Sequence, residues 1–421
     1  MFKQIIKIIW KQRRSNGWIF MELLMVAAVL WYVADMLWID TRVYNQPLGY
    51  DIENCWRLKL YDLNSNAPGF VNEEDRTTTE TEDLIALMEN IRRETEVENV
   101  CAAFYSHPYS WGNSWNSLEP VEGDTATART RSYQTRRVTP EFFDVFRVKD
   151  KHGNAITPQL PPGEHCYVIS EDMEEQFFEG KEGKGQRVRN NNQSNSILVA
   201  AVSTPIRASD YEISDPCFFD VMVGSQLETM VNSFNASSAE VCLRMKRAMT
   251  LEEMYLFLES MGERLTVNNI YVYGAYSIAH QRKEVISYYQ NESRTKIALM
   301  GFMLVNVFFG IIGTFWLRTQ HRRGEIGLRI AMGSTTSGIS RFMNLESLSL
   351  LLLTLPFILL FVGNMAFLDI IESGRIPIGW ERILPVVFAT YLLLAIIIWL
   401  GIRIPARKAA SLPPAEALRH E

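Results

Sequence analysis

Four long apolar segments alternate with polar ones along the chain, and each is long enough to cross a lipid bilayer as a helix. They cover residues 18–38, 295–317, 345–371 and 383–404. A hydrocarbon core about 30 Å thick requires roughly 20 apolar residues in helical conformation. Tryptophans lie at or near the ends of the first, second and fourth segments, as expected for rings that settle at the depth of the lipid headgroups. The pattern therefore predicts four transmembrane helices.

The short segments that flank the apolar ones are basic. Residues 1–17 contain five Lys or Arg and no acid, residues 318–344 contain five Arg and one Glu, and the tail from Arg403 contains four cations and two acids. The whole chain has a formal net charge of −6, so the remainder is strongly acidic. Because short cytoplasmic loops are enriched in Lys and Arg, these segments and both termini are predicted to be cytoplasmic. Residues 39–294 and the loop 372–382 are then extracytoplasmic.

Residues 1–17 combine this charge with an apolar periodicity, since Phe2, Ile5, Ile6 and Ile9 recur at helical spacing. The pattern favours an amphipathic helix that lies in the inner membrane interface, in contact with lipid. An extension of the first transmembrane helix, anchored by its cations, explains these residues equally well. A cleavable signal peptide is disfavoured because the apolar run is too long and Asp35 interrupts it.

Residues 39–294 are numerous enough to form a core of their own, and their pattern predicts mixed α and β structure. Amphipathic helices are predicted at residues 80–95 and 250–264, the second of which opens with a capping box. Strands are predicted at residues 99–105, 166–169, 196–202, 217–223, 240–244 and 267–273. The expected fold class is an α-helical membrane protein with four transmembrane helices and a large α+β extracytoplasmic domain between helices 1 and 2.

Candidate chemistry in this domain is sparse. All five cysteines lie here, and their odd number without paired spacing favours buried free thiols over disulfides. No metal-ligand spacing and no set of nucleophile, base and orienting residue can be assembled, so we expect no metal, no cofactor and no enzymatic activity. Membrane lipid is an expected partner, and nucleic acid is not. The aromatic stretch 105–116 is predicted to be an ordinary loop, with a partner-binding loop as the alternative.

The segment that leads into the second span lacks helix breakers. No Pro and no pair of Gly interrupts residues 276–317. A single helix of this length would reach roughly 60 Å, about twice the thickness of the membrane core, and could carry force as a stalk. The alternative is a hinge at residues 291–295, where polar side chains follow one another.

Glycines punctuate residues 318–344, between the second and third apolar segments. A short helix over residues 325–332 should end at Gly333, which can take the left-handed conformation of a C-cap. Ser334 can cap the next helix, on which Ile339, Phe342 and Met343 share one face. Anchoring by arginines at the inner surface explains the cations but not the glycines.

The run RRGEIGLRIAMGS at residues 322–334 resembles the RREIG-x-R-x-A-x-G coupling segment of MacB-type and FtsX-like ABC-transporter permeases. The tail RIPARKAASLPPAEALRHE is similar to the P-A-R-x-A-A-x-x-x-P-x-E-A-L-R ending of that family. Residues 136–149 and 167–188 resemble two stretches of the MacB periplasmic core domain. The resemblance implies an ATPase-coupling loop that contains Arg323, Glu325, Ile326, Gly327, Arg329, Gly333 and Ser334. It also implies a cytoplasmic tail motif that contains Pro405, Arg407, Glu416 and Arg419.

The resemblance further implies a bacterial inner-membrane protein that works by mechanotransmission. A cytoplasmic ABC ATPase dimer closes on ATP and pushes the coupling loop, and the movement reaches the outer domain. The full MacB protein has an ATPase domain before its first span, whereas here no GxxxxGK[ST] motif occurs, and the closest run, 180–186, has Gln186 at the Lys position. We therefore expect a separate ATPase subunit, a second permease copy or related permease and, for efflux, a periplasmic adaptor and outer-membrane channel.

Two alternatives stay open within this resemblance. The chain could be an FtsX-like signalling permease that activates an extracytoplasmic cell-wall hydrolase, although the size of the outer domain disfavours that function. Glu22 is the acid best placed to be buried in a span, and an intramembrane charge predicts a functional pairing with another helix. It lies one turn inside Trp18, however, and could equally reach the inner interface.

Overall fold

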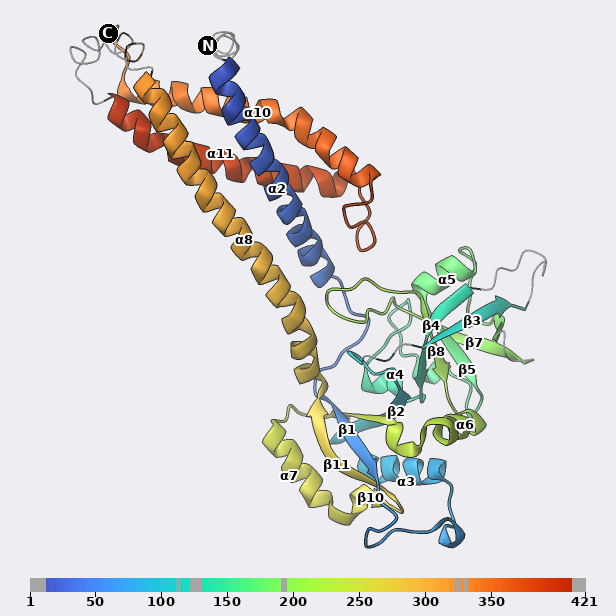
Figure 1. Cartoon of the computed structure of the whole chain (residues 1–421). Helices are drawn as coiled ribbons and strands as arrows, with labels where there is room; N and C mark the ends of the chain where they lie inside the picture. The colour runs from blue at the N-terminus through green and yellow to red at the C-terminus, as the bar shows by residue number, and fades with distance from the viewer. Residues whose placement is uncertain are drawn as a thin grey trace. The chain divides into compact units, whose positions relative to one another are not determined.

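The computed structural model describes residues 13–110, 112, 114–121, 131–190, 195–321, 324, 326, 328 and 332–410. The chain divides into two compact units. The helical unit comprises Met1–Val43 and Gln290–Glu421, and the sheet unit comprises Tyr44–Tyr289. Figure 1 shows long helices in the first unit and a sheet covered by shorter helices in the second.

In the described residues, four helices are long and apolar enough to span a membrane. They are α2 (Arg13–Tyr44), α8 (Ile278–His321), α10 (Thr336–Phe367) and α11 (Trp380–Ala410). α8 begins in the sheet unit and continues into the helical unit as one helix. The prediction of a single helix through residues 291–295 is therefore confirmed, and the alternative of a hinge there is wrong.

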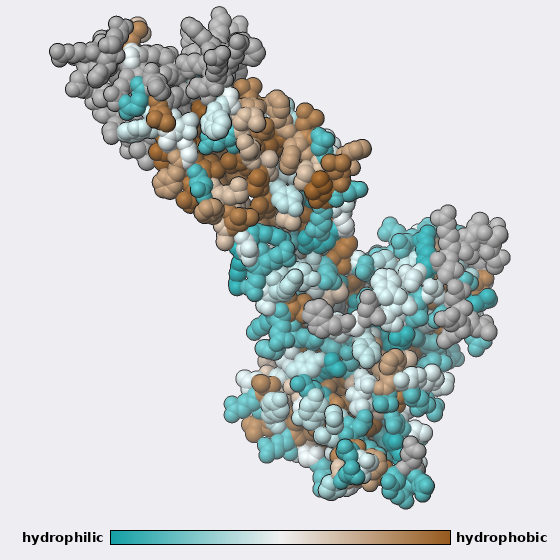
Figure 2. Space-filling model, in the orientation of Figure 1, coloured by the Kyte–Doolittle hydropathy of each residue, from teal (hydrophilic) through white to brown (hydrophobic). Residues whose placement is uncertain are grey.

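Apolar stripes of these helices form the core of the helical unit. Ile19, Leu23 and Leu30 are buried along one face of α2, in a cluster that includes Ile311 of α8 and Leu394 of α11. Large apolar side chains on the outer surface are exposed, among them Phe302, Phe309 and Phe388. Figure 2 shows this apolar surface in brown on the helical unit, while the sheet unit is mostly teal. Such a surface suits a lipid environment.

Two helix ends differ from the sequence prediction. α10 begins after Thr335, whose Oγ1 accepts a hydrogen bond from the N–H of Gly338 at 3.2 Å, so Thr335 is the N-cap instead of Ser334. α10 ends at Phe367, before the predicted end at residue 371, because Asp369 has a φ of 51° that a right-handed helix cannot include. Gly333 has a φ of 91°, the left-handed conformation predicted for it.

The sheet unit contains eleven strands in the part of the chain that the structure describes. They are β1 (Cys55–Asp62), β2 (Val97–Phe104), β3 (Trp115–Pro120), β4 (Arg131–Val138), β5 (Cys166–Ser170), β6 (Arg187–Asn190), β7 (Ser196–Ser203), β8 (Cys217–Val221), β9 (Glu240–Met245), β10 (Thr266–Val267) and β11 (Ile270–Ser277). One half has the order β10-β11-β1-β9-β2. The other half runs β4-β3-β6-β7-β5-β8, and a parallel pairing of β8 with β4 closes it into a ring.

Short helices cover the sheet: α3 (Glu80–Arg92), α4 (Phe142–Val145), α5 (Glu171–Phe177), α6 (Ser225–Phe234) and α7 (Leu251–Met261). Single 3₁₀ turns lie at η1 (Glu73–Asp75), η2 (Thr157–Gln159), η3 (Ala236–Ser238) and η4 (Gly262–Leu265). Leu84 and Leu87 of α3 share a core with Met254 of α7. The predicted capping box at Thr250 is confirmed.

Five of the six predicted strands correspond to β2, β5, β7, β8 and β9. The sixth, at residues 267–273, is divided into β10 and β11, because Asn268 adopts a φ of 48° and turns the chain. β1, β3, β4 and β6 were not predicted. Their partly exposed, polar sequences lack the continuous apolar runs of the strands that were found.

All five cysteines are buried free thiols. Burial raises the pKa of Cys55 and that of Cys166 to about 12. Both therefore stay protonated at neutral pH and act as small apolar side chains in the core.

Candidate functional site

The first turns of α8 carry a polar network that ties this helix to two loops of the sheet unit. Gln281 Oε1 lies 3.1 Å from His107 Nε2, and Gln281 Nε2 donates to the carbonyl of Tyr109 at 2.8 Å. Arg282 donates to both carboxylate oxygens of Asp210, at 2.6 and 3.2 Å. The hydroxyl of Tyr109 donates to the same carboxylate at 2.8 Å. The first turns of α8, which we call its root, are thus hydrogen-bonded to both loops.

The position of this network follows from the strand that precedes α8. β11 pairs with β1 up to Ser277, and α8 begins at the next residue, Ile278, which is fully buried. A helix that continues directly from a paired strand has its first turn placed by the sheet. Gln281 and Arg282 lie within that first turn and a half, so the sheet determines where they point.

A buried carboxylate lies at the centre of the network. Glu240 Oε1 is 2.9 Å from His107 Nδ1 and 3.6 Å from Arg57 Nη1, and its side chain is 5% exposed. Its Oε2 accepts hydrogen bonds from the backbone N–H groups of Ser106 and His107 at 2.8 and 3.1 Å. Burial acts to raise the pKa of Glu240, but the contacts with His107 and Arg57 outweigh it and leave that pKa below its ordinary value. Glu240 is therefore a carboxylate at neutral pH.

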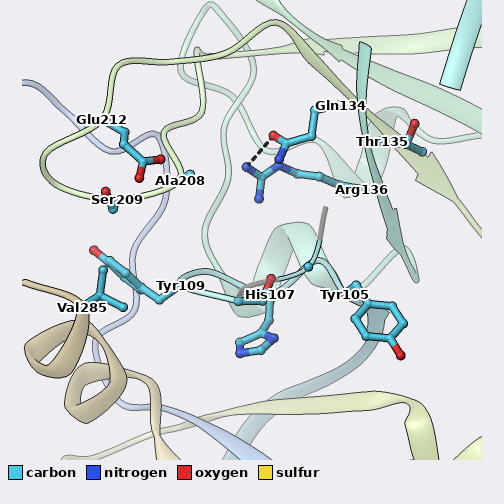
Figure 3. A pocket seen from close by; sticks show the side chains of 12 residues that line it. Tyr105, His107, Tyr109, Gln134, Thr135, Arg136, Ala208, Ser209, Glu212 and Val285 are labelled. Carbon is cyan, nitrogen blue, oxygen red and sulfur yellow. Dashed lines mark hydrogen bonds between the residues drawn. The ribbon is translucent and has the colours of Figure 1, made fainter. Parts of the chain in front are cut away.

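A cavity of about 210 Å³ lies beside this network. Its wall includes His107 and Tyr109, Arg136 of β4, Ser209, and Val285 of α8. Figure 3 shows these side chains around the cavity, and they come from a strand, two loops and a helix. Because Val285 belongs to α8, a molecule in this cavity would contact the root of that helix.

A second group of buried charges lies in the helical unit, near the C-terminal end of α2. Arg382, in the first turn of α11, donates to both carboxylate oxygens of Asp35 at 2.8 and 2.6 Å, and both side chains are 2% exposed. Arg382 also donates to the carbonyls of Glu372 and Ile376 at 2.6 and 2.7 Å. These bonds hold α2, α11 and the α10–α11 loop together.

Asp40, one and a half turns further along α2, adds contacts of the same kind. It accepts a hydrogen bond from Arg375 at 2.9 Å and one from Ser293 of α8 at 3.2 Å, and Lys296 of α8 lies 3.4 Å from it. Our sequence analysis did not identify Arg375, Arg382 or Asp40 as partners. The available signal was an acid near the end of the first span and cations just before the fourth.

The predicted coupling loop is described only in part. Ile326 is half-buried and packs against the core of the helical unit, which also contains Ile339 and Met343 of α10. Gly333 and Ser334 form the turn before α10. The remaining predicted residues, Arg323, Glu325, Gly327 and Arg329, lie outside the described residues. Contact with an ATPase stays a prediction for all seven.

The predicted tail motif is divided between helix and undescribed chain. Pro405 and Arg407 lie within α11, which continues to Ala410. Glu416 and Arg419 lie outside the residues that the structure describes.

Glu22 packs against α8 within the helical unit. A Cβ placed on Gly310 would lie 2.7 Å from Glu22 Oε1, so a larger residue there would displace the end of the Glu22 side chain. Glu22 forms no ion pair with any residue that the structure describes. Its neighbour on α8 is Gly310. A functional pairing with another helix and reach to the inner interface both stay predictions.

No protein-family model and no curated protein matches the sequence. Similar solved structures include the following three, each at 14% sequence identity. A domain of a protein described as a permease, from Porphyromonas gingivalis, has a TM-score of 0.35 and covers 55% of this chain and 92% of its own. The periplasmic region of MacB from Actinobacillus actinomycetemcomitans has a TM-score of 0.32, with 58% and 97% covered. The extracellular domain of the noncanonic ABC-type transporter YknZ from Gram-positive bacteria has a TM-score of 0.29, with 51% and 98% covered. Similarity at this level does not assign the chain to a family.

Proposed function

We propose that this chain is the permease subunit of an ABC transporter complex in the bacterial inner membrane, with both termini in the cytoplasm. A cytoplasmic ATPase dimer acts on residues 318–344, and the resulting movement reaches the sheet unit on the other side of the membrane. The basic flanks of the spans support this orientation. The coupling-loop and tail motifs support the ATPase as the partner.

The continuity of α8 carries the proposal. Its 44 residues correspond to about 66 Å at 1.5 Å per residue, roughly twice the thickness of a hydrocarbon core. Its first turns are hydrogen-bonded inside the sheet unit through Gln281 and Arg282. Its last residue, His321, precedes the run that resembles the coupling segment. A push on that run is transmitted because the helix has no break between its two ends.

The contacts of the helical unit favour a pivot at one end of the bundle. Asp35 and Asp40 join α2 to α11, α8 and the α10–α11 loop near the proposed outer surface. At the other end of α11, a hollow of about 630 Å³ opens between α10 and α11, and Arg341 and Arg403 line it. Charged contacts thus join the helices at the outer end, whereas α10 and α11 leave a hollow between them at the inner end, where the ATPase would act.

Polar side chains inside the helical unit favour transmission of movement over passage of a polar substrate between the described helices. The hydroxyl of Thr354 lies 2.8 Å from that of Tyr391. Ser347 and Thr390 each donate to a carbonyl one turn back in their own helix, at 2.9 and 2.8 Å. These four hydroxyl groups are thus satisfied within the bundle.

Charge reversal in the coupling loop tests the proposal. The chain is purified from its native membranes together with the proteins bound to it. We expect a P-loop ATPase among them, in an amount equal to that of the chain. Glu325→Arg and Arg329→Glu should leave insertion and ATP hydrolysis intact but reduce ATP-dependent changes in the protease sensitivity of the sheet unit by about tenfold, a loss of roughly 1.4 kcal/mol of coupling. Lys283→Glu, on the exposed face of α8, is the matched control.

Two outcomes contradict this function. One is wild-type chain that purifies without any ATPase. The other is full coupling in both loop variants, because the charges of the loop would then play no part in contact with the ATPase.

A further inference from the structure

Arg136 of β4 is a buried arginine without a counter-charge. It is 8% exposed, its Nη2 donates to Gln134 Oε1 at 3.3 Å, and its buried Nε has no hydrogen-bond partner. No carboxylate of the described chain lies at ion-pair distance from it. Burial raises the pKa of Asp215, although the charge of Arg136 acts to lower it. A buried charge is normally paired or bound to a ligand.

The hydroxyl group of Ser209, on another wall of the same cavity, also lacks a hydrogen-bond partner among the described residues. Ser209 is 3% exposed, and its Oγ is buried. Both Arg136 and Ser209 line the cavity of about 210 Å³. Figure 3 shows the Arg136 and Gln134 side chains on one side of it and Ser209 on a separate loop. Buried polar groups in proteins are nearly always hydrogen-bonded, either to protein or to ordered water. A molecule bound between Arg136 and Ser209 would therefore gain hydrogen bonds from both.

We propose that this cavity binds a single small carboxylate, held by the guanidinium of Arg136 and the hydroxyl of Ser209. A guanidinium matches the planar, two-oxygen geometry of a carboxylate. The volume corresponds to about seven water molecules at about 30 Å³ each, which admits a carboxylate with a short tail. Glu212 lies in the cavity wall and its exposed carboxylate repels negative charge, so a ligand with one carboxylate is favoured over one with two. Either a free small acid or the C-terminus of a peptide has this chemistry.

Binding at this site would affect α8, because residues of the cavity wall contact this helix. His107 and Tyr109 line the cavity and also contact Gln281 of α8, and Val285 of α8 forms part of the wall. A bound carboxylate therefore stabilises the loop that holds the root of the helix. Binding itself does not depend on the proposed transporter function, so the two can be tested separately.

Titration calorimetry of the full-length chain in detergent tests the site. The probes are acetate, a tripeptide with a free C-terminus, the same tripeptide with an amidated C-terminus, and inorganic phosphate. We expect binding of a free carboxylate and none of the amidated peptide or phosphate, and acetate against tripeptide distinguishes a small acid from a peptide end. Ser209→Ala should weaken binding about fivefold through loss of one hydrogen bond. Arg136→Gln should abolish it, while Arg187→Gln, an exposed arginine of β6, should not change it.

The proposal is overturned if the wild-type chain binds neither free carboxylate with a Kd below about 10 mM. It is equally overturned if Arg136→Gln binds as the wild type does. Should Arg136→Gln fail to fold, as judged by loss of the sheet-unit unfolding transition, the other comparisons decide. Equal affinity for the free and amidated peptides, or an unchanged Kd in Ser209→Ala, would then reject the site.

Discussion

The sheet unit and the helical unit each bury an arginine almost completely, and the two arginines are compensated differently. In the sheet unit, Arg244 is 1% exposed and donates to the backbone carbonyls of Val145, Glu53 and Asp51 at 2.6 to 2.7 Å. Its only carboxylate partner among the described residues is that of Asp51, at the longer distance of 3.4 Å. In the helical unit, Arg382 is 2% exposed and has the carboxylate of Asp35, on another helix, as its charged partner.

The surroundings of the two arginines explain the difference. Loops between strands can turn free carbonyls toward a buried cation, whereas the carbonyls of a helix interior are already bonded within the helix. A cation between helices is therefore neutralised by the carboxylate of an acid or by backbone carbonyls of a loop. Carbonyl networks hold loops locally, while one carboxylate can hold two whole helices. Arg382 thus depends chiefly on one charged contact, and Arg244 chiefly on backbone carbonyls.

Loss of the Asp35–Arg382 pair should have the largest effect. Asp35→Asn leaves the Arg382 charge buried without an acid, and breaking a buried pair costs about 3–5 kcal/mol. Thermal unfolding of the full chain in detergent should show a clearly lower transition temperature. Glu381→Gln changes the exposed neighbour of Arg382 and should have almost no effect. Equal transition temperatures for these two variants would show that the pair does not hold the helices.

A double replacement sharpens this comparison. Asp35→Leu together with Arg382→Met removes both charges and should recover most of the lost stability, because two apolar side chains need no counter-charge. If the double variant is as unstable as Asp35→Asn, the carbonyl contacts of Arg382 must account for the loss instead.

A smaller effect is expected at the root of α8. Arg282→Gln removes two hydrogen bonds to the buried carboxylate of Asp210, while the hydrogen bond from Tyr109 to that carboxylate remains. The free energy of unfolding should fall by about 2 kcal/mol. Hydrogen exchange should increase in residues 105–110 and in the first turns of α8 but not in α10 or α11. Lys283→Gln is the exposed control on the same helix. Equal exchange in both variants would mean that the Arg282 contact does not anchor the helix.

The smallest effect concerns a single carboxylate of the sheet unit and appears as a pH dependence. Burial opposes ionisation of Asp150, but hydrogen bonds from Gln159 and Asn154 outweigh it and lower the pKa of Asp150 from 3.8 to about 2. A carboxylate with a lowered pKa stabilises the fold above its unfolded pKa of 3.8, and this stabilisation is lost as the pH falls through about 2. Asp150→Asn should therefore differ most from wild type above about pH 4.

Urea unfolding of the two proteins at several pH values measures this effect. The difference in their unfolding midpoints should shrink steadily as the pH is lowered from about 4 to about 2. A difference that stays constant over that range would mean that Asp150 titrates with its ordinary pKa.

Residues close together in the chain carried much of the fold prediction. Apolar periodicity was sufficient for four long helices and for the uninterrupted α8, because these depend on neighbours three or four positions apart. The same holds for the capping box at Thr250. Short-range pattern failed at β1, β3, β4 and β6, whose pairing with distant strands overrides their weak propensity. Ser334 and Thr335 are both good caps, and only the backbone path selects between them.

The candidate sites, in contrast, consist mainly of contacts between residues that lie far apart in the chain. The stretch 105–116 was predicted to be an ordinary loop or a binding loop, and the fold places Tyr105 and Tyr109 in a cavity wall. Asp35 meets Arg382 across 347 positions, and His107 meets Gln281 across 174. Such contacts leave no periodic trace in a single sequence, because any residue of suitable charge could have filled either position. Hydrophobic pattern therefore established the spans, and the basic flanks their orientation, as expectations. The packing of strands and helices alone decided which charges were paired, and it left Arg136 without a counter-charge.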